Sequence, residues 1–346
     1  QELFVTDHFN LARFGELRLS SGGVRPIPTQ LIDPNDFDPS GVSTSGNGNV
    51  NAVKVQEEVN NNNYIVLDDG STVSNPRPIP YLNPTTGTLT AGSSVENVEG
   101  VLSYSFDEYR LHPLEEVSFE LVPRAEIIQF TGEAPRTISL CAFNVLNYFT
   151  TLGEWGAQSQ RELERQTDKI VSALTTINAD VFGLMEIENN GDEAYNNLLQ
   201  ALNESLGSEV YRALNNESPG NFQTKNVIFY NSNTVEPVGP LFATDAVQFE
   251  RPSLGQVFKP LGEDDGEFLF VVNHLRFKGC DGASGLNQDQ GDGQACFNQR
   301  RKEQAAALVN FIAAVQSQMG TGPVYLAGDM NAYYQEDPID LLRANN

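Results

Sequence analysis

The sequence predicts an α+β protein, in which an all-β region is followed by a layered α/β domain. Residues 1–128 hold short extended stretches separated by turn residues, which is typical of a β-rich module. Over residues 137–346, apolar runs of strand length alternate with amphipathic helical segments. The segment 129–136 between the two regions, which contains "FTGEAPR", is interpreted as a linker.

The first region is expected to be built from short strands. Polar or proline-rich connections, among them "STSGNGNVNA" and "NPRPIPYLNPTTGT", predict long loops between these strands. The expected strands, in chain order, lie in "ELFVTD", "GELRLSS", "NNYIVLDDGS", "EGVLSYSFDEYRL" and "EEVSFELV".

The second region alternates buried strands with helices. In "AQSQRELERQTDKIVSALTTI", the apolar residues Leu163, Ile170, Leu174 and Ile177 fall on one helical face. A second helix, "EAYNNLLQALNESLG", ends at Gly207, and a third is "RRKEQAAALVNFIAAVQ". Strands that are apolar throughout require helices on their faces, so a layered α/β domain follows. The expected strands are "TISLCAFNV", "ADVFGLMEI", "KNVIFYN", "EFLFVVNHLRF" and "VYLAGDM".

The composition limits the possible functions. With 21 Lys and Arg against 46 Asp and Glu, the chain of 346 residues carries a formal charge of -25, which opposes long-range attraction to nucleic acid. Any nucleic-acid site must therefore be local and assisted by metal ions. Such acidity also suits a secreted protein. No apolar run approaches the length of about 20 residues that a bilayer requires, so no membrane span is expected.

The three cysteines predict one disulfide. Cys280 and Cys296 bracket the polar loop "CDGASGLNQDQGDGQAC", and Cys141 lies in an apolar strand. We expect a bond between Cys280 and Cys296, which implies an oxidising compartment. Two free thiols on a flexible loop are the alternative, and metal ligation is less favoured because no further Cys or His lies at zinc spacing.

Polar side chains stand at the ends of four apolar strands of the second region. Ligands commonly gather at one end of the strands in layered sheets, so these side chains are expected to converge on one site. Taken singly, each has a structural alternative, such as a turn cap, a solvated carboxylate or a hydrogen-bonded core histidine, and Glu188 competes with its neighbour for any role. The residues are Asn144, Glu186, His274, Asp329 and Asn331.

The combination fits phosphoester hydrolysis. That reaction needs a hard cation, a carboxylate to hold it, a group that orients or deprotonates water, and a donor for the leaving oxygen. Glu186 and Asp329 supply carboxylates, which Mg²⁺ prefers as ligands. Asn144 and Asn331 supply neutral polar groups, and His274 supplies a cation or a hydrogen-bond donor.

Five ordered motifs resemble the endonuclease/exonuclease/phosphatase superfamily, which has the fold of deoxyribonuclease I. They are "FNVLN", "GLMEIENN", "VVNHLRFKGC", "GDGQACFNQRR" and "GDMNAYYQEDPID". More narrowly, the chain is similar to large secreted bacterial endonucleases of the ExeM type. In the first region, "VTDHFNLARFGELRLS", "LDDGS" and "GVLSYSFDEYRLHP" are similar to the β-rich, OB-like region that precedes the nuclease domain in those proteins.

The resemblance implies a role for each residue. Glu186 matches a metal-binding glutamate, and Asn144 matches an asparagine that helps to bind metal and phosphate. His274 matches an active-site histidine that contacts the scissile phosphate. Asp329 and Asn331 match the Asp-x-Asn pair that orients the attacking water and stabilises the pentacovalent transition state, and Asp329 is also expected among the metal ligands. Mg²⁺ is the expected metal, with Mn²⁺ as a substitute.

The resemblance is incomplete at the C-terminus. The family has a late Ser-Asp-His segment, whose histidine acts with an acidic partner as general acid or base, and no such segment precedes Asn346. His8 and His112 stand in the β-rich region, in the wrong contexts to replace it. We therefore expect a C-terminally incomplete domain, whose partner is the missing C-terminal segment of the same polypeptide.

Positive residues near the expected site are candidates for contacts with substrate phosphate. A solvated helix start is the alternative for part of this set. Asp281, Asp289 and Asp292, in the loop between the cysteines, are a candidate Ca²⁺ site whose spacing does not match an EF-hand. The phosphate candidates are Arg276, Lys278, Arg300 and Arg301.

The resulting hypothesis is a secreted bacterial, metal-dependent endonuclease that hydrolyses DNA with low sequence specificity, with RNA as a further candidate substrate. Its expected location is extracellular, with the periplasm or the cell surface as variants. One alternative is a phosphoesterase of the same fold that acts on a small phosphate or a phospholipid headgroup. Another is a catalytically incomplete fragment in which Tyr104, Phe106 and Tyr109 stack on single strands. The sequence assigns no oligomeric state.

Overall fold

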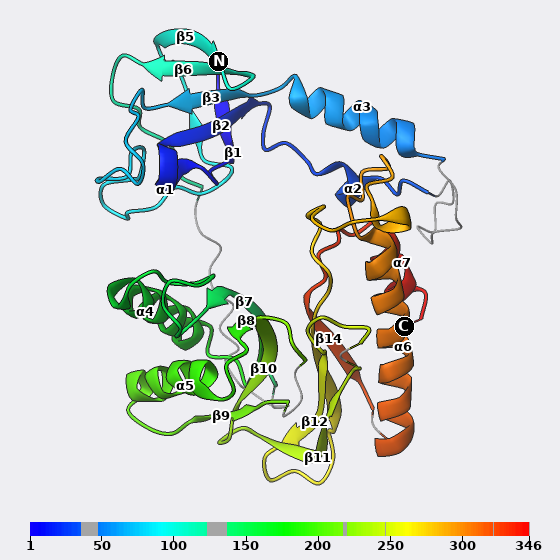
Figure 1. Ribbon diagram of the computed structural model, residues 1–346. Helices are drawn as coiled ribbons and strands as arrows, with labels where there is room; N and C mark the ends of the chain where they lie inside the picture. Colours follow the sequence, from blue (N-terminus) through cyan, green and yellow to red (C-terminus); the bar gives the residue numbers. More distant parts are fainter. Residues whose placement is uncertain (36–47, 123–136, 217–219, 246, 321, 346) are drawn as a thin grey trace. The chain divides into compact units, whose positions relative to one another are not determined.

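The computed structural model describes residues 1–35, 48–122, 137–216, 220–245, 247–320 and 322–345 (Figure 1). The chain divides into two compact units, one made of Gln1–Pro34 with Gly48–Glu126 and the other of Asn35–Asn47 with Ile127–Asn346. Within the described ranges, no helix is long and apolar enough to cross a bilayer. The expected linker 129–136 lies outside the described residues.

The first unit is built around a six-stranded sheet with the order β4-β1-β2-β3-β6-β5. Neighbouring strands are antiparallel except β3 and β6, which run parallel. The sheet packs around an apolar cluster that includes Val5, Leu17, Leu19 and Leu67. Its strands are β1 (Leu3–Asp7), β2 (Glu16–Ser21), β3 (Ile65–Asp68), β4 (Ser94–Val95), β5 (Gly100–Ser105) and β6 (Glu108–Pro113).

This unit also contains helices, so the expectation of an all-β region was wrong in this respect. Helix α3 (Val50–Asn61) begins inside the stretch that the sequence indicates as a polar loop, and Val53 is its one buried residue. Its four valines are β-branched, which lowers helix propensity, so the sequence does not favour a helix here. The expected strand "EEVSFELV" contributes a single bridge, between Ser94 and Glu120. The short helices are α1 (Leu11–Phe14) and α2 (Pro28–Leu31).

Two four-stranded sheets form the second unit, with the orders β7-β8-β10-β9 and β11-β12-β13-β14. Strands β7 and β8 are parallel, as are β13 and β14, so the carboxyl ends within each pair lie side by side. The strands are β7 (Leu140–Tyr148), β8 (Val181–Glu188), β9 (Tyr211–Leu214), β10 (Thr224–Asn231), β11 (Val235–Ala243), β12 (Leu254–Pro260), β13 (Phe268–His274) and β14 (Val324–Asp329).

The second unit has four layers. Helices α4 (Gln160–Ile177) and α5 (Glu193–Leu206) share an apolar cluster with the first sheet, and α6 (Asn298–Met319) shares one with the second. A third cluster, which includes Met185, Ile228, Phe258 and Phe270, joins the two sheets. Figure 1 shows α4 and α5 on one side of this unit and α6, with α7 (Asp337–Arg343), on the other. The 3₁₀ helix η1 (Gly285–Asn287) lies in the loop before α6.

Most elements of this unit follow the sequence pattern. Ser159 caps α4 by accepting a hydrogen bond from the backbone N–H of Glu162, and Gly207, with a φ of 70°, ends α5. The predicted strands and helices of this region are confirmed. Strands β9, β11 and β12 were not predicted, and in β11 two prolines interrupt the strand signal.

We expect the substitution Gly328→Ala to destabilise the second unit. The φ of Gly328 is 136°, and a Cβ at this position would lie 2.0 Å from the backbone oxygen of Asn273 on β13. The methyl group must therefore push β14 away from β13, and the free energy of unfolding should fall by about 3 kcal/mol. Urea denaturation measures this loss. Gly322→Ala is the control, because a Cβ there has no neighbour closer than 3.4 Å; an equal loss in both variants would contradict the interpretation.

Candidate functional site

Four strands of the second unit bring polar side chains to one place. Asn144 and Glu186 lie near the carboxyl ends of β7 and β8, and β13 and β14 end on His274 and Asp329. His274 and Asp329 are direct partners in the parallel register. Because β14 also contacts β7 and β8 across the sandwich, the side chains of both sheets meet there. The structure therefore brings together four of the residues that the sequence singles out.

A single amide nitrogen joins the two carboxylates of this site. Asn144 Nδ2 donates to Glu186 Oε1 at 2.9 Å and to Asp329 Oδ2 at 3.2 Å. The first bond lies within one sheet, and the second crosses to the other. The side-chain oxygen of Asn144 accepts from the backbone N–H of Leu146 at 2.9 Å, which fixes the orientation of the amide. Two carboxylates from different sheets are thereby held close together.

The backbone around Glu186 adopts an unusual conformation. The φ angle is 67° at Glu186, 56° at Leu146 and 49° at Asn147, in a region that side-chain-bearing residues rarely adopt. The backbone N–H of Asn147 donates to Glu186 Oε2 at 2.8 Å, so the distorted segment contacts the carboxylate directly. Such conformations cost roughly 1–3 kcal/mol each and cluster at functional sites.

Glu188 has a structural role instead of a place in the site. Its side chain is buried, and Oε2 accepts from the backbone N–H groups of Thr150 at 2.8 Å and Thr151 at 3.0 Å. The amide of Asn190 also donates to this oxygen, at 2.9 Å. An oxygen with three such donors fixes the loop after β7. The carboxylate of Glu186 is therefore the one available at the strand end.

His274 is a buried imidazole with 3% of its surface exposed. Its Nε2 lies 3.7 Å from Asp329 Oδ2, and Nδ1 has no hydrogen-bond partner among the described residues. Burial and then the charge of Arg251 lower the pKa of His274 to about 3, although Asp329 opposes this shift. At neutral pH the ring is uncharged, so one of its two nitrogens carries a proton that it can donate. Of the two roles that the sequence left open, the uncharged ring fits the hydrogen-bond donor.

Arg251 is a site residue that the sequence did not reveal. Its side chain is 7% exposed, and Nη2 donates to the backbone oxygen of Leu275 at 2.9 Å. Burial lowers the pKa of Arg251 to about 10, while the charges of Glu250, Glu186 and Asp329 raise it, so the side chain stays charged at neutral pH. It places a buried positive charge beside His274. No motif marks it, because it precedes β12, whereas Asn144, Glu186, His274 and Asp329 lie within or at the ends of their strands.

An open cavity of about 530 Å³ adjoins the site. Its wall includes Asn144, Asp329, Asn331, Lys278 and Tyr333. The backbone N–H of Asn331 donates to Asp329 Oδ1 at 2.9 Å, which holds the Asp-x-Asn pair together. A cavity of this size is in the range of small-molecule sites.

The expected phosphate-binding residues are partly engaged with other groups. Lys278 lines the cavity but forms an ion pair with the buried carboxylate of Glu336. Arg300 Nε lies 3.4 Å from Glu250 Oε1. The guanidinium of Arg276 lies over an aromatic ring and is half-buried. A phosphate at this site would therefore compete with carboxylates for two of these three cations.

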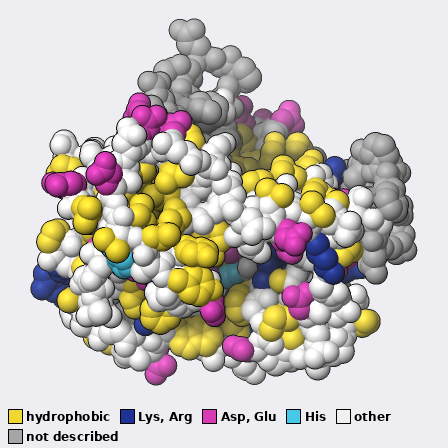
Figure 2. All heavy atoms as spheres, turned by 90° about the horizontal axis from the view of Figure 1, so that it is seen from above, with side chains coloured by type: hydrophobic (Ala, Val, Ile, Leu, Met, Phe, Trp, Pro, Cys, Tyr) yellow, Lys and Arg dark blue, Asp and Glu magenta, His cyan; other side chains and the backbone are white. Residues whose placement is uncertain are grey.

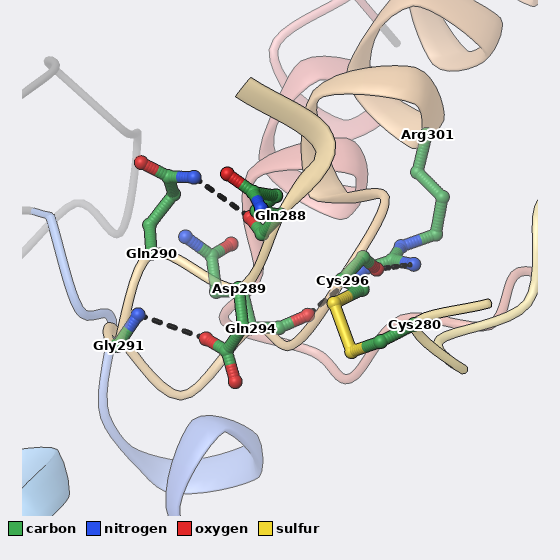
Figure 3. Close-up of a disulfide and its surroundings, with 8 residues drawn as sticks. All are labelled: Cys280, Gln288, Asp289, Gln290, Gly291, Gln294, Cys296 and Arg301. Atoms are coloured by element: carbon green, nitrogen blue, oxygen red, sulfur yellow. Dashed lines mark hydrogen bonds between the residues drawn. A yellow bond between two sulfur atoms is a disulfide. The ribbon is translucent and has the colours of Figure 1, made fainter. Parts of the chain in front are cut away.

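The assignment of Arg301 to substrate phosphate was wrong. Its side chain has no exposed surface, and its guanidinium donates to the backbone oxygens of Cys296 at 2.8 Å and Gln294 at 2.7 Å (Figure 3). Burial lowers the pKa of Arg301 to about 10. The residue stabilises the cysteine loop from inside, because the first turn of α6 directs it away from solvent.

Cys280 and Cys296 form the predicted disulfide (Figure 3), and Cys141 is a free, half-buried thiol. The expected Ca²⁺ site in this loop is not supported. Asp289 Oδ1 accepts from the backbone N–H of Gly291 at 2.8 Å, and Asp292 is buried and bonded in the same way within its own turn. Over the described ranges, there is no group of three or more His, Cys, Asp or Glu side chains suited to a metal ion.

The donor set of the candidate site fits one hard divalent cation. Mg²⁺ is usually held by one or two carboxylates, and water molecules complete its shell. Glu186 and Asp329 provide two carboxylates, and the amide nitrogen of Asn144 holds them close together. The adjoining cavity leaves space for water and for the oxygens of a phosphate.

The profile of the endonuclease/exonuclease/phosphatase family matches residues 141–346, which is more than half of the chain. The chain belongs to this family. Proteins of this family generally use divalent metal ions, in agreement with the donor set described above. No curated protein matches the sequence significantly.

Solved structures of endonuclease/exonuclease/phosphatase proteins resemble the chain. The catalytic domain of human nocturnin with bound sulfate is 16% identical, with a TM-score of 0.40, and the match covers 58% of this chain and 67% of nocturnin. ANGEL2, a 2′,3′-cyclic phosphatase, is 15% identical, with a TM-score of 0.40, over 56% of this chain and 52% of ANGEL2. An endonuclease/exonuclease/phosphatase family protein from Bacteroides thetaiotaomicron is 16% identical, with a TM-score of 0.41. This match covers 61% of the present chain and 69% of the Bacteroides chain. The chain thus spans about half the length of ANGEL2.

The substitution Asn144→Asp tests the metal site. The new carboxylate replaces an amide that donates hydrogen bonds to the carboxylates of Glu186 and Asp329. Repulsion among the three carboxylates should lower the free energy of unfolding in chelator by about 2 kcal/mol. A bound cation relieves this repulsion, so Mg²⁺ should raise the melting temperature more in the variant than in the wild type. Thermal denaturation with Mg²⁺ and with chelator measures both effects.

The control for this experiment is Asn144→Ala, which removes the hydrogen bonds without adding a charge. Its response to Mg²⁺ should not exceed that of the wild type. Equal responses of Asn144→Asp and the wild type would contradict a metal site at Glu186 and Asp329.

Removal of the disulfide should destabilise the second unit. The bond links residues 16 apart, and the chain-entropy estimate for such a loop is roughly 3 kcal/mol. We expect the double substitution of Cys280 and Cys296 by serine to lower the free energy of unfolding in urea by about this amount, in buffer without reductant. Cys141→Ser is the control. A double variant as stable as the wild type would show that hydrogen bonds, such as those of Arg301, hold the loop without the disulfide.

Proposed function

We propose that the chain is part of a secreted, metal-dependent endonuclease of the deoxyribonuclease I type, which cleaves DNA with low sequence specificity. One observation carries this proposal. Strands of both sheets bring two carboxylates, one amide and one neutral imidazole together beside an open cavity. The resemblance to bacterial endonucleases of the ExeM type supports the substrate and the secretion. The disulfide is compatible with an extracellular location.

The residues of the candidate site would have the following roles in hydrolysis. Glu186 and Asp329, with Asn144, would hold one Mg²⁺ or Mn²⁺. When bound, the ion would supply positive charge against the non-bridging phosphate oxygens. The neutral ring of His274 would donate a hydrogen bond to the scissile phosphate. Asp329 and Asn331 would orient the attacking water.

The acidity of the chain restricts how DNA is held. Asp and Glu side chains are scattered over the face shown in Figure 2, where few Lys and Arg side chains appear. With a formal charge of -25, long-range attraction to a polyanion is absent. Binding would therefore depend on the metal ion and on short-range contacts from Arg276, Lys278 and Arg300.

Two other functions have specific support. The charge of -25 and the cavity of about 530 Å³ also suit a small phosphate or a phospholipid headgroup as substrate. A nucleic-acid-binding fragment is suggested by Tyr104 and Tyr109, which are exposed and meet edge-on at 5.1 Å on the β5–β6 hairpin. This last alternative is the weaker one, because Arg18 and Arg110, the cations of that sheet, are paired with carboxylates.

We further propose that the open strand edges of the second unit, on β7 and β14, pair with a further β-segment. In the described part of the chain, β7 pairs with β8 alone and β14 with β13 alone. An apolar cavity of about 780 Å³ extends from Leu140 on β7 to Tyr325 and Leu326 on β14. An added β-segment would cover this apolar surface and pair the open strand edges.

The domain limits remain part of the proposal. We propose an OB-like accessory region over residues 1–128, a linker at 129–136 and a catalytic domain at 137–346. The division of the chain into two compact units, with a boundary between residues 126 and 127, supports two domains. Strands β4 and β5, at the two ends of the six-stranded sheet, do not pair with each other among the described residues.

Digestion of supercoiled plasmid tests the function. We expect nicking with Mg²⁺, alone or with Ca²⁺, none with chelator, and a loss of at least about 100-fold in rate for Asp329→Ala. Asp289→Ala, in the cysteine loop, is the matched control and should cleave normally. Intact mass must show which chains are present in the preparation. Hydrolysis of a small phosphodiester without any cleavage of plasmid would favour the small-phosphate alternative.

A further inference from the structure

The sole tryptophan of the chain belongs to an exposed aromatic cluster. Trp155 is 52% exposed, while Phe149 beneath it is 3% exposed. The two rings are stacked with centroids 6.4 Å apart, and Phe222 meets the indole edge-on at 5.9 Å. We call these three rings the Trp155 cluster. A buried ring therefore anchors an indole whose remaining surface is open to solvent.

Hydrogen bonds fix the Trp155 cluster at the carboxyl end of β8. The backbone N–H of Thr150, next to Phe149, donates to Glu188 at 2.8 Å. On the other side, Asn189 Nδ2 donates to the backbone oxygen of Phe222 at 2.9 Å. Both anchors lie within three residues of Glu186, the expected metal ligand. The cluster thus stands at the strand end that carries the candidate site.

A second connection runs through the buried arginine of the site. The guanidinium of Arg251 lies 4.9 Å from the centroid of Phe222, in the geometry of a cation–π contact. The same guanidinium donates to the backbone oxygen of Leu275, the residue after His274. The Trp155 cluster is therefore continuous with the site on both the Glu186 side and the His274 side.

The chemistry of the cluster selects one type of ligand. A rigid, half-exposed indole offers a flat π surface, and every nucleobase has a π face that can stack on it without regard to sequence. Stacking needs no positive charge, so it suits a chain with a formal charge of -25 better than phosphate contacts do. An inositol or a glycerol headgroup has no aromatic face to match.

We propose that Trp155 binds an unpaired nucleobase of the substrate, next to the phosphate that is cleaved. The inference rests on the proposed phosphodiesterase function and deepens it, because it makes a nucleic acid with exposed bases the substrate class. Trp155 is a positioning residue in this scheme. The base is common to DNA and RNA, so both must be compared in the test.

The first experiment uses the fluorescence of the one tryptophan. The wild-type chain is titrated in chelator with oligothymidylate of about eight nucleotides, a length within the usual range for single-strand sites. Stacking should quench the fluorescence as the oligonucleotide binds. A phosphodiester chain of the same length without bases should leave it unchanged. Oligouridylate in a parallel titration shows whether RNA binds in the same way as DNA.

The second experiment measures binding of labelled chains by fluorescence anisotropy. Trp155→Ala should weaken the binding of oligothymidylate about tenfold, since stacking on an aromatic side chain contributes about 1.4 kcal/mol or more per base. The chain without bases should bind to this variant and to the wild type equally. Trp155→Tyr should restore most of the lost affinity. Leu152→Ala, which removes an exposed apolar side chain from the same loop, is the control and should bind normally.

The outcomes separate this inference from the function on which it rests. If Trp155→Ala weakens both chains equally, the effect comes from the loop, and the stacking role is refuted. If the wild type nicks plasmid but shows no quenching and no dependence on bases, the inference fails while the nuclease function stands. If the wild type neither binds oligonucleotides nor cleaves plasmid, both fail.

Discussion

The side-chain amide of Asn144 is the interaction on which the candidate site depends. One nitrogen donates to a carboxylate of its own sheet and to a carboxylate of the opposite sheet. The apolar core between the sheets tolerates small shifts of one layer against the other, whereas a hydrogen bond confines its atoms to a narrow range of distances. The hydrogen bonds of Asn144 therefore restrict both the position of one sheet against the other and the distance between Glu186 and Asp329. The left-handed backbone at Glu186 is held by the packed strands on both sides of it.

Much of the site could be predicted from one property of the sequence. Continuous apolar runs stop at a polar residue, and that rule located Asn144, Glu186, His274 and Asp329 without knowledge of the fold. Strand ends are visible in this way because the strands of a layered domain are apolar throughout. The resemblance of the motifs then indicated the family, which the match over residues 141–346 establishes.

The remaining features depend on contacts that sequence order does not reveal. Arg251 precedes its strand, and it reaches the site by bonding to the backbone of Leu275 on a neighbouring segment. Arg301 looked like part of a basic patch beside Arg300, but the two point in different directions from the first turn of α6, and Arg301 is enclosed by carbonyl oxygens. Helix α3 was not predicted because it begins in a polar stretch and its four valines are β-branched, which disfavours a helix.

Among the residues that the structure describes, β14 pairs with β13 alone, and this open edge has a consequence for how the chain behaves in solution. An unpaired strand edge exposes a row of N–H and C=O groups that another copy can pair with, and Tyr325 adds exposed apolar surface beside it. The high negative charge opposes this contact, because like-charged molecules repel one another. Salt screens that repulsion over about 10 Å at an ionic strength of 0.1 M. Pairing between exposed strand edges thus favours association of the chain, and repulsion between negative charges opposes it. Added salt weakens the repulsion and shifts the equilibrium toward association.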